Sequence, residues 1–458
     1  MITSAIRHLS FYPFVQALAR NRIQWRLEAA PGDLTACELV CWKRSEPEVL
    51  FRTSLLPGLE DGQWQQWTGE TIFTGETHYI KYGFWLEDQA GNRRWLNDRG
   101  LFTDMQESGS FELLQVNETD ILAVPAWAQG CIYYQIFPER FARRGPAGAG
   151  MDDWNAAPTR DNVLGGNLGG IIDRIPYLSE LGVECLYLNP IFTGDFNHKY
   201  ATTDYFSVDP MFGTKDTLRE LVARCHEAGI RVILDGVFNH ISSRHFLFQD
   251  VLRNGMESKY YSCFYQLPAK PKLPAPGELP EYTCFSYVAS MPKTNTADPY
   301  LRQYFCDVGV YWIREFDIDG WRLDVANELD DGFLRAFRTA VKAAKPDAVI
   351  VGEVWENAAH YLNGDMMDSA MNYDFRRYCR RFFAEETVDA ETFDTNVSTL
   401  LLRYRENALF AQLNLLDSHD VSRYLSLCGE NVDKMELSVL LQMTFPGMPC
   451  VFYGDEKG

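Results

Sequence analysis

The sequence contains no apolar stretch that approaches the roughly 20 residues of a membrane-spanning helix. Its most apolar N-terminal run, Leu9 to Ala19, is short for a secretory signal and is interrupted by Pro13. A basic patch is also missing, and the 458 residues carry a net charge of −20, which argues against binding to nucleic-acid phosphates. We therefore expect a cytoplasmic protein with neither a membrane nor a nucleic acid as its partner.

Paired zinc ligands are missing as well. Cys37 and Cys41 have a metal-like spacing, but no second pair of Cys or His residues accompanies them. The eleven cysteines are scattered, and Cys131, Cys185 and Cys450 lie in apolar runs where cysteine serves as a small hydrophobic residue. Reduced cysteines of an intracellular protein are the simpler interpretation.

Apolar residues make up 46% of the chain, which suffices for the cores of two or three domains at this length. Residues 1–117 alternate short strand-like runs with Pro-Gly and Asp-Gly turns, a pattern typical of an antiparallel β-sandwich. Residues 118–129 form a linker. From residue 130 to residue 458, strands alternate with helical stretches, and this predicts an α/β fold, a (β/α)8 TIM barrel.

The barrel prediction places eight strands and one large insertion. The strands are expected to start near Ile132, Glu184, Val232, Gly320, Ala348, Ser369, Leu413 and Cys450. The insertion, about residues 241–298, follows the third strand, and because long loops in compact domains are usually functional, we expect a subdomain that walls the active site. The chain ends at Gly458 directly after the eighth strand, so we expect a barrel that lacks its last helix.

Several predicted strands end in charged residues. Their Val, Ile and Leu runs suit strands that are buried on both faces, where an ionised group costs several kcal/mol unless it is paired. Asp324, Glu353 and Asp420 follow the fourth, fifth and seventh strands. Because the carboxyl ends of barrel strands converge, these acids predict one polar site at one rim of the barrel.

A pair of carboxyl groups at such a rim suits glycoside hydrolysis, in which one attacks the sugar carbon and the other protonates the leaving oxygen. Arg322 lies two residues before Asp324, on the same side of the strand, and is expected to keep Asp324 ionised. Glu353 is followed by Val354 and Trp355, and these hydrophobic neighbours are expected to raise its pKa and suit it to acid catalysis.

These residues give the chain a resemblance to the α-amylase family, glycoside hydrolase family 13, and within it to the neopullulanase, cyclomaltodextrinase and maltogenic amylase group. The four segments that resemble the family's signature regions are 235–240, 320–328, 352–355 and 415–420, and segments 165–192 and 445–458 match family patterns too. Residues 291–295 are similar to the short motif that marks the neopullulanase group. The resemblance extends over the whole chain, and residues 1–117 look like the group's starch-binding-like domain.

The resemblance implies a retaining mechanism that cleaves α-1,4 bonds, with α-1,6 bonds as a further target, in cyclodextrins, pullulan, starch or maltooligosaccharides, with some sugar transfer. Asp324 would be the nucleophile and Glu353 the general acid and then base, while Asp420 would grip sugar hydroxyls and distort the ring. The substrate-binding residues that it implies are Arg322, His240, His419, Tyr200, Trp355 and Glu328. His240 and His419 would bond sugar hydroxyls at the cleavage site, where Tyr200 would stack on the sugar.

The sequence departs from the family pattern at several positions. Thr294 stands where the group's motif usually has Leu, and Val421 where Thr is common. Relatives often bind calcium through an Asn-Gly-Asp-type loop, but here the loop 143–150 is rich in Arg and Gly, and Asn167 replaces an Asp. Calcium therefore remains open, since hard cations need several oxygen ligands. The resemblance also implies a homodimer, formed through the N-terminal domain.

Other interpretations of the same residues stay open at this point. Asp235 is as well explained by a structural bond to Arg322 as by a direct role. A barrel metallohydrolase could be built from Asp235, His240, His419 and Asp420, although the first strand offers no metal ligand. A family relative that only binds α-glucans is the non-enzymatic alternative. The sequence does not rank cyclodextrin, pullulan and starch as substrates.

Overall fold

The computed structural model describes residues 1–75, 77–105, 109–159, 162–275 and 277–457, so that Gly458 lies outside the described residues. The chain forms two compact units. The first consists of Met1–Ala123, Ala359–Asp365 and Glu385–Leu409, and the second of Val124–Ala358, Met366–Ala384 and Phe410–Gly458. Among the helices of the described residues, none combines the length and the hydrophobicity needed to cross a membrane.

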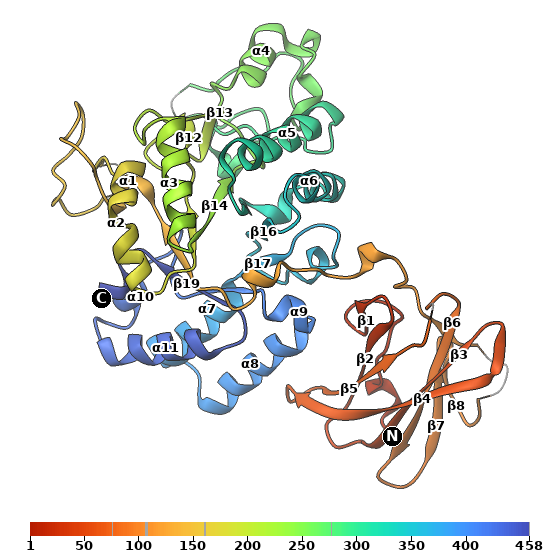
Figure 1. Ribbon diagram of the computed structural model, residues 1–458. Coiled ribbons are helices and arrows are strands. Elements are labelled where there is room, and N and C mark those ends of the chain that lie inside the picture. The colour runs from red at the N-terminus through yellow and green to blue at the C-terminus, as the bar shows by residue number, and fades with distance from the viewer. Residues whose placement is uncertain (76, 106–108, 160–161, 276, 458) are drawn as a thin grey trace. The chain divides into compact units, whose positions relative to one another are not determined.

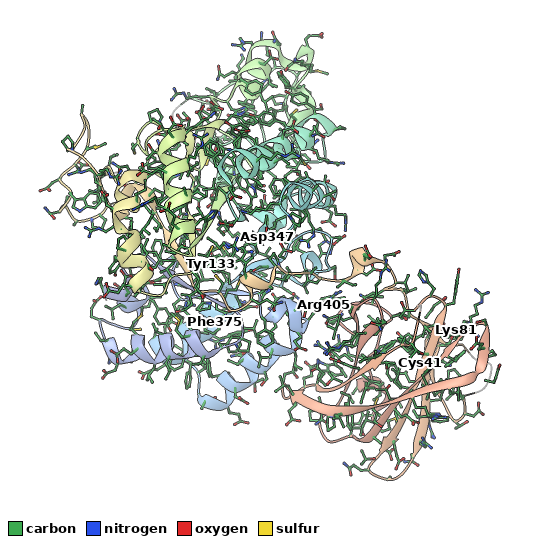
Figure 2. The ribbon with its side chains drawn as sticks, in the orientation of Figure 1. Cys41, Lys81, Tyr133, Asp347, Phe375 and Arg405 are labelled. Carbon is green, nitrogen blue, oxygen red and sulfur yellow. The ribbon has the colours of Figure 1, made fainter. Side chains whose placement is uncertain are left out.

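The first unit contains an antiparallel β-fold with an apolar core. Its strands are β1 (Val15–Ala19), β2 (Arg22–Ala29), β3 (Leu34–Lys43), β4 (Glu46–Glu60), β5 (Gln65–Ile72), β6 (Ile80–Asp88), β7 (Arg93–Asn97), β8 (Gly100–Phe102) and β9 (Phe111–Glu112). Alternate residues of β2, β3 and β6, such as Trp25, Cys41 and Tyr82, point into one shared core, as the period of two predicts. Cys41 is labelled in Figure 2.

The first unit also includes α8 (Ala390–Arg403) and α9 (Glu406–Leu409), which come late in the sequence. The guanidinium of Arg405, which is only 2% exposed, lies 4.5 Å from the centre of the Tyr12 ring. The Tyr12 hydroxyl donates to the carbonyl oxygen of Arg403 at 3.0 Å, and Arg26 donates to that of Leu402. These contacts join the end of α8 to the first strands of the chain.

The second unit is a closed barrel of eight parallel strands (Figure 1). They are β10 (Tyr133–Ile136), β11 (Cys185–Leu188), β14 (Arg231–Gly236), β15 (Gly320–Leu323), β16 (Val349–Gly352), β17 (Ser369–Asn372), β18 (Leu413–Leu415) and β19 (Met448–Phe452). Each starts within two residues of its predicted position. The predicted TIM barrel is therefore confirmed. Tyr133, labelled in Figure 2, lies in its fully buried core.

The register of the strands brings the predicted site residues to one level. Asp235 on β14 pairs with Arg322 on β15, and Leu323 pairs with Gly352 on β16. The residues that follow this last pair are Asp324 and Glu353, so both leave the barrel at the same height. β18 ends earlier, at Leu415, so Asp420 lies in the loop after the seventh strand and not at its end.

Helices follow most strands of the barrel. They are α1 (Pro138–Phe141), α2 (Leu168–Glu180), α3 (Lys215–Glu227), α4 (Phe246–Asn254), α5 (Pro299–Phe316), α6 (Asp331–Ala344), α7 (Tyr373–Cys379), α10 (Tyr424–Leu427) and α11 (Val432–Thr444). Residues 241–298, the predicted insertion, contain α4 and short 3-10 turns. Asp298 ends this stretch and caps α5, because its carboxylate accepts the backbone N–H groups of Tyr300 and Leu301. Between β11 and α3, the strands β12 (Phe192–Asp195) and β13 (Ala201–Val208) form an antiparallel hairpin.

Candidate active site

A cavity of about 860 Å³ lies where the barrel strands end. Its lining includes eight residues that the sequence predicted as site residues: Tyr200, His240, Asp324, Glu328, Glu353, Trp355, His419 and Asp420. The insertion supplies Phe285, Ser286, Val288 and Met291, so it forms part of the wall as expected. Arg322, the ninth predicted residue, is fully buried beside these groups.

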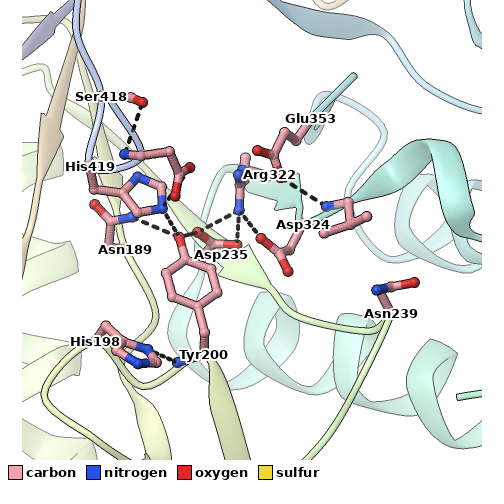
Figure 3. A network of polar contacts seen from close by, with 12 residues as sticks. Asn189, His198, Tyr200, Asp235, Asn239, Arg322, Asp324, Glu353, Ser418 and His419 are labelled. Atoms are coloured by element: carbon pink, nitrogen blue, oxygen red, sulfur yellow. Dashed lines mark hydrogen bonds and ion pairs between the residues drawn. The ribbon is translucent and has the colours of Figure 1, made fainter. Parts of the chain in front are cut away.

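Arg322 holds three carboxylates together (Figure 3). Its Nη1 atom donates to Asp235 at 2.8 Å and to Asp324 at 2.8 Å, and Nη2 lies 2.8 Å from Oε2 of Glu353. Their side chains are no more than 7% exposed. A single guanidinium therefore fixes the positions of Asp324 and Glu353 relative to one another. Because one cation faces three carboxyl groups, this buried cluster would carry a net negative charge if all three were ionised.

The expected ionisation of Asp324 needs a correction. Arg322 does contact this carboxyl group, as the spacing predicted. Burial nevertheless raises the pKa of Asp324 well above its usual range, and repulsion from Glu353 and Asp235 adds to the rise against the opposing effect of Arg322. One cation shared among three acids cannot hold all of them in the charged form.

The prediction of a raised pKa for Glu353 is wrong in this ligand-free site. Burial acts in that direction, but Arg322 and the backbone N–H of Val325 outweigh it and lower the pKa of Glu353. The Val325 N–H donates to Oε2 at 2.9 Å, and the indole N–H of Trp355 donates to Oε1 at 2.9 Å. Trp355 was expected to act as an apolar neighbour, but it contacts the carboxylate through its polar edge.

The backbone at Val325 is strained. This β-branched residue has φ 45° and ψ 48°, in the left-handed region that such residues avoid. The conformation turns its N–H toward Glu353, so local strain is coupled to the orientation of a site carboxylate.

Tyr200 and His419 form a second layer of contacts around Asp235. The Tyr200 hydroxyl donates to Oδ2 of Asp235 at 2.7 Å and receives a bond from Nε2 of His419 at 2.6 Å. Gln135 donates to Nδ1 of His419 at 2.9 Å, which assigns the proton to Nε2. Burial lowers the pKa of His419 to about 4, so the ring is neutral near pH 7. Tyr200 stacks on the His419 ring at 5.2 Å and 3°.

Asp235 has a structural place in this network. Its carboxylate is 1% exposed and binds Arg322, Tyr187 and Tyr200, and it is not among the residues that line the cavity. These bonds occupy the group that a metallohydrolase would need as a ligand. No cluster of three or more His, Cys, Asp or Glu side chains that could hold a metal occurs among the described residues.

Sequence reasoning missed the role of Lys293, which comes from the insertion. Its ammonium group donates to Glu328 Oε2 at 2.8 Å and also to the side-chain oxygen of Asn239, in the loop after the third strand. The amide nitrogen of Asn239 lies 3.3 Å from Nδ1 of His240, whose buried Nε2 atom has no hydrogen-bond partner among the described residues. Lys293 thus connects Glu328 and His240, which both line the cavity.

Thr294 also has a clear structural role, although it departs from the motif of the group. Its hydroxyl donates to the carbonyl oxygen of Phe238 at 2.6 Å. The residue secures the insertion to the barrel through a polar bond instead of an apolar side chain.

Loop 143–150 and Asn167, where the resemblance suggests calcium, make bonds within the protein. The side-chain oxygen of Asn167 accepts the N–H groups of Gly170 and Arg144, and its amide nitrogen donates to the carbonyl oxygen of Arg144. The Arg144 guanidinium pairs with Asp173 at 2.6 Å. A guanidinium and a fully engaged amide do not supply the several oxygen ligands that calcium needs, so these residues do not fit the ion.

Asp420 gives a testable effect on stability. Burial raises the pKa of Asp420 to about 6, with Glu353 adding to the rise and Arg322 opposing it. Folding therefore favours the protonated form of Asp420. Above pH 6 the carboxyl group is ionised in the folded protein, and its buried charge lowers the stability. This cost disappears as the pH falls toward about 4, the pKa of the group in the unfolded chain. We expect Asp420→Asn to stabilise the protein by about 1 kcal/mol at pH 8 and to leave its stability unchanged at pH 4. The value at pH 8 is reduced because the side chain is 38% exposed and solvent screens its charge.

Urea unfolding at both pH values measures this difference. Glu436→Gln, which removes an exposed acid on α11, serves as the control and should change stability little at either pH. An equal gain from Asp420→Asn at pH 4 and pH 8 would contradict the account.

Comparisons with known proteins agree with this geometry. Residues 135–458 match the family described as Alpha amylase, catalytic domain, and residues 1–117 match the Alpha amylase, N-terminal ig-like domain. The whole chain is 41% identical to a cyclomaltodextrinase from Geobacillus thermopakistaniensis and 39% identical to neopullulanase 2 from Thermoactinomyces vulgaris, covering 79% and 78% of those proteins. A solved cyclomaltodextrinase structure superposes with a TM-score of 0.93 at 39% identity, over the whole of this chain and 78% of that one. The chain belongs to the α-amylase family.

Proposed function

We propose that this protein hydrolyses α-glucosidic bonds in cyclodextrins, pullulan, starch or maltooligosaccharides with retention of the anomeric configuration. The observation that carries the proposal is the pair Asp324 and Glu353, held by one buried guanidinium in a cavity large enough for several sugar units. Two carboxyl groups at the carboxyl ends of neighbouring barrel strands are what a retaining glycosidase requires. Relatives named cyclomaltodextrinase and neopullulanase support the substrate class.

The chemistry proceeds in two balanced steps. The reacting form of the site has Asp324 ionised and the proton on Glu353, which reverses the tendency of the ligand-free site, where the pKa of Asp324 is raised and that of Glu353 is lowered. In the first step, a carboxylate oxygen of Asp324 bonds to the anomeric carbon, the glycosidic C–O bond breaks, and Glu353 gives its proton to the leaving oxygen. In the second, Glu353 takes a proton from water, which attacks the anomeric carbon and releases Asp324. When a sugar hydroxyl replaces the water, the same step transfers the sugar.

The remaining cavity residues bind the substrate in this proposal. The buried Nε2–H of His240 and the side chains of His419 and Asp420 bond hydroxyls of the sugar at the cleavage site. Tyr200 packs against that sugar. Trp355, whose indole N–H bonds Glu353, and Glu328, which also lines the cavity, contact the sugars of the leaving group.

The ionisation of Glu353 leads to a pH prediction. The pKa of Glu353 is lowered in the free site, whereas acid catalysis needs its proton. A bound sugar chain excludes water and adds to the burial that raises this pKa, so the acid form persists to higher pH in the complex. We expect the alkaline limb of kcat, which reports the complex, to lie at higher pH than that of kcat/KM, which reports the free enzyme. Coincident limbs would contradict this reasoning.

Lys293 provides a second test. Replacing it by Met removes the ammonium group from Glu328 and Asn239, so the Asn239 amide that lies against Nδ1 of His240 loses its anchor. We expect kcat/KM on maltooligosaccharides to fall roughly ten- to hundredfold, because small misplacements of binding groups have effects of this size. Lys272→Met, which changes an exposed lysine of the same insertion, is the matched control. Equal activity of the two variants would show that Lys293 does not position the site.

The proposed activity is tested directly with purified protein. β-Cyclodextrin, pullulan and soluble starch are incubated separately, the reducing ends are quantified, and the first products are examined by proton NMR for their anomeric configuration. Cleavage with α-configured products supports the proposal, and β-configured products would replace the retaining mechanism by an inverting one. A folded protein that leaves all three substrates intact would exclude the activity.

We further propose that the protein is a cytoplasmic homodimer that associates through the N-terminal domain. The cytoplasmic location is supported by the eleven cysteines, all of which are free thiols and most of which are buried. Size-exclusion chromatography with light scattering tests the assembly, and a monomer at micromolar concentration would exclude it.

A further inference from the structure

Phe196 is an exposed aromatic residue next to the active-site cavity. It lies in the turn between β12 and β13, and its side chain is 52% exposed. Its backbone has φ 64°, in the left-handed region that is unfavourable for a bulky residue. A single exposed hydrophobic residue is ordinary by itself, so the argument depends on what holds this ring and what the ring touches.

The turn that carries Phe196 is firmly anchored. Lys199, which also has a positive φ of 61°, forms an ion pair with Asp209 at 2.8 Å, and both side chains are less than 10% exposed. The Lys199 ammonium group also donates to the carbonyl oxygen of Gly194 at 3.2 Å, and Ser242 donates to Asp195 at 2.5 Å. The strain at Phe196 is therefore maintained by buried polar bonds on both sides of the turn.

Phe196 is the outermost member of a series of neighbouring aromatic rings. Its ring stacks on that of His198, with 5.2 Å between the centres and 16° between the planes, and the His198 ring lies 5.8 Å from that of Tyr200 at a tilt of 33°. Tyr200 in turn stacks on His419 at 5.2 Å. Nδ1 of His198 accepts the backbone N–H of Tyr200 at 3.1 Å, which fixes the imidazole ring (Figure 3). The rings lead from the exposed edge of the turn to the site carboxylates.

The position of these aromatic rings relative to Glu353 indicates which end of the substrate they would contact. Glu353 protonates the leaving oxygen in the proposed function, so the sugars of the leaving group bind on its side, with Trp355. Figure 3 shows Tyr200 and His198 on the other side of Arg322 from Glu353. His198 and its neighbour Asn197 both line the cavity. His198 and Tyr200 therefore border the part of the cavity that holds the glycone, the sugars retained on Asp324, and Phe196 lies against His198 just outside the lining residues.

We propose that Phe196 and His198 form a binding platform for a glucose unit of the glycone beyond the one at the cleavage site. The apolar face of a glucose ring packs on the exposed face of Phe196, and amphipathic stacked rings are suited to a ligand that is apolar on its faces and polar at its edges. The inference rests on the proposed function and deepens it, because it assigns a contact to sugar units outside the reacting pair.

The test uses p-nitrophenyl α-glucoside, α-maltoside and α-maltotrioside, whose leaving group is the same and whose glycone grows by one glucose at a time. We expect Phe196→Ala to leave kcat/KM for the glucoside unchanged and to lower it roughly three- to tenfold for the maltoside or the maltotrioside, the range for one lost aromatic contact. Phe196→Trp should retain the wild-type values. Phe246→Ala removes a phenylalanine of similar exposure, 46%, whose ring contacts His245, Tyr260 and Tyr304 instead of His198, and it should change none of the three.

The outcomes separate this inference from the proposed function. A wild type that cleaves none of the three glycosides, cyclodextrin or starch contradicts the proposed function. A wild type that is active, with Phe196→Ala equal to it on all three glycosides, overturns the platform alone. An equal loss on all three, the glucoside included, would assign Phe196 a structural role in the turn and overturn the platform as well. Calorimetric titration of maltotriose into Glu353→Gln and into Glu353→Gln with Phe196→Ala measures the same contact without turnover, and equal affinities would contradict it.

Discussion

Replacing Glu353 by Gln is expected to lower kcat on β-cyclodextrin and starch by about a thousandfold or more, while the protein keeps its fold. The amide cannot supply a proton to the leaving oxygen or accept one from water, and general acid–base catalysis contributes effects of this order. The substitution preserves the shape of the side chain, so its bond from the Val325 N–H can be retained. Reducing-end assays and circular dichroism on wild type and variant measure the two quantities.

A substrate with a good leaving group distinguishes the acid from the nucleophile. α-Maltosyl fluoride needs little protonation of its leaving group, so Glu353→Gln should release about one equivalent of fluoride per enzyme and then stall at the second step. Asp324→Asn should release none, because no bond to the anomeric carbon can form. Sustained turnover of the fluoride by Asp324→Asn would mean that another group is the nucleophile.

The largest expected effect on stability comes from replacing Arg322 by Met. The change leaves Asp235, Asp324 and Glu353 buried without their cation, and removing one partner of such a buried pair costs about 3–5 kcal/mol. The carboxyl groups would then hold their protons to higher pH in the folded protein than in the unfolded chain. The loss of stability should therefore be greatest near pH 8 and smaller at pH 4, where these groups are neutral in the folded variant and about half protonated in the unfolded chain.

Urea unfolding of Arg322→Met at pH 4 and pH 8 tests this expectation. If the variant does not fold at pH 8, Arg322→Met combined with Asp235→Asn, which removes one of the three charges, should recover part of the loss. Arg335→Met changes an exposed arginine on α6 and controls for the substitution itself. A loss that is independent of pH would show that packing, and not charge, dominates at Arg322.

The sequence was sufficient to predict the barrel, because its strands are long apolar runs with a helix-forming stretch between most of them. The site could be located for a related reason. Arg322, Asp324 and Glu353 lie at the ends of neighbouring strands, and the parallel register places them together without any contribution from distant loops. The same reasoning placed Asp420 only approximately, since its strand ends at Leu415.

Ionisation within the site could not be predicted from neighbours in the sequence. The pKa of Glu353 depends on Arg322, which lies 31 positions away, and on the backbone N–H of Val325, whose strained conformation has no signal in the sequence. Lys293 was missed for a similar reason. Its partners, Asn239 and Glu328, come from the loops after two different strands, so the contact exists only once the insertion has folded against the barrel.

The contacts of Arg405 and Arg403 with Tyr12 affect which fragments of this protein can be expressed separately. A cut near residue 120 would separate Met1–Ala123 from Ala359–Asp365 and Glu385–Leu409, which belong to the same compact unit but come far downstream in the sequence. An expressed fragment of residues 1–117 would expose the surface that α8 and α9 cover.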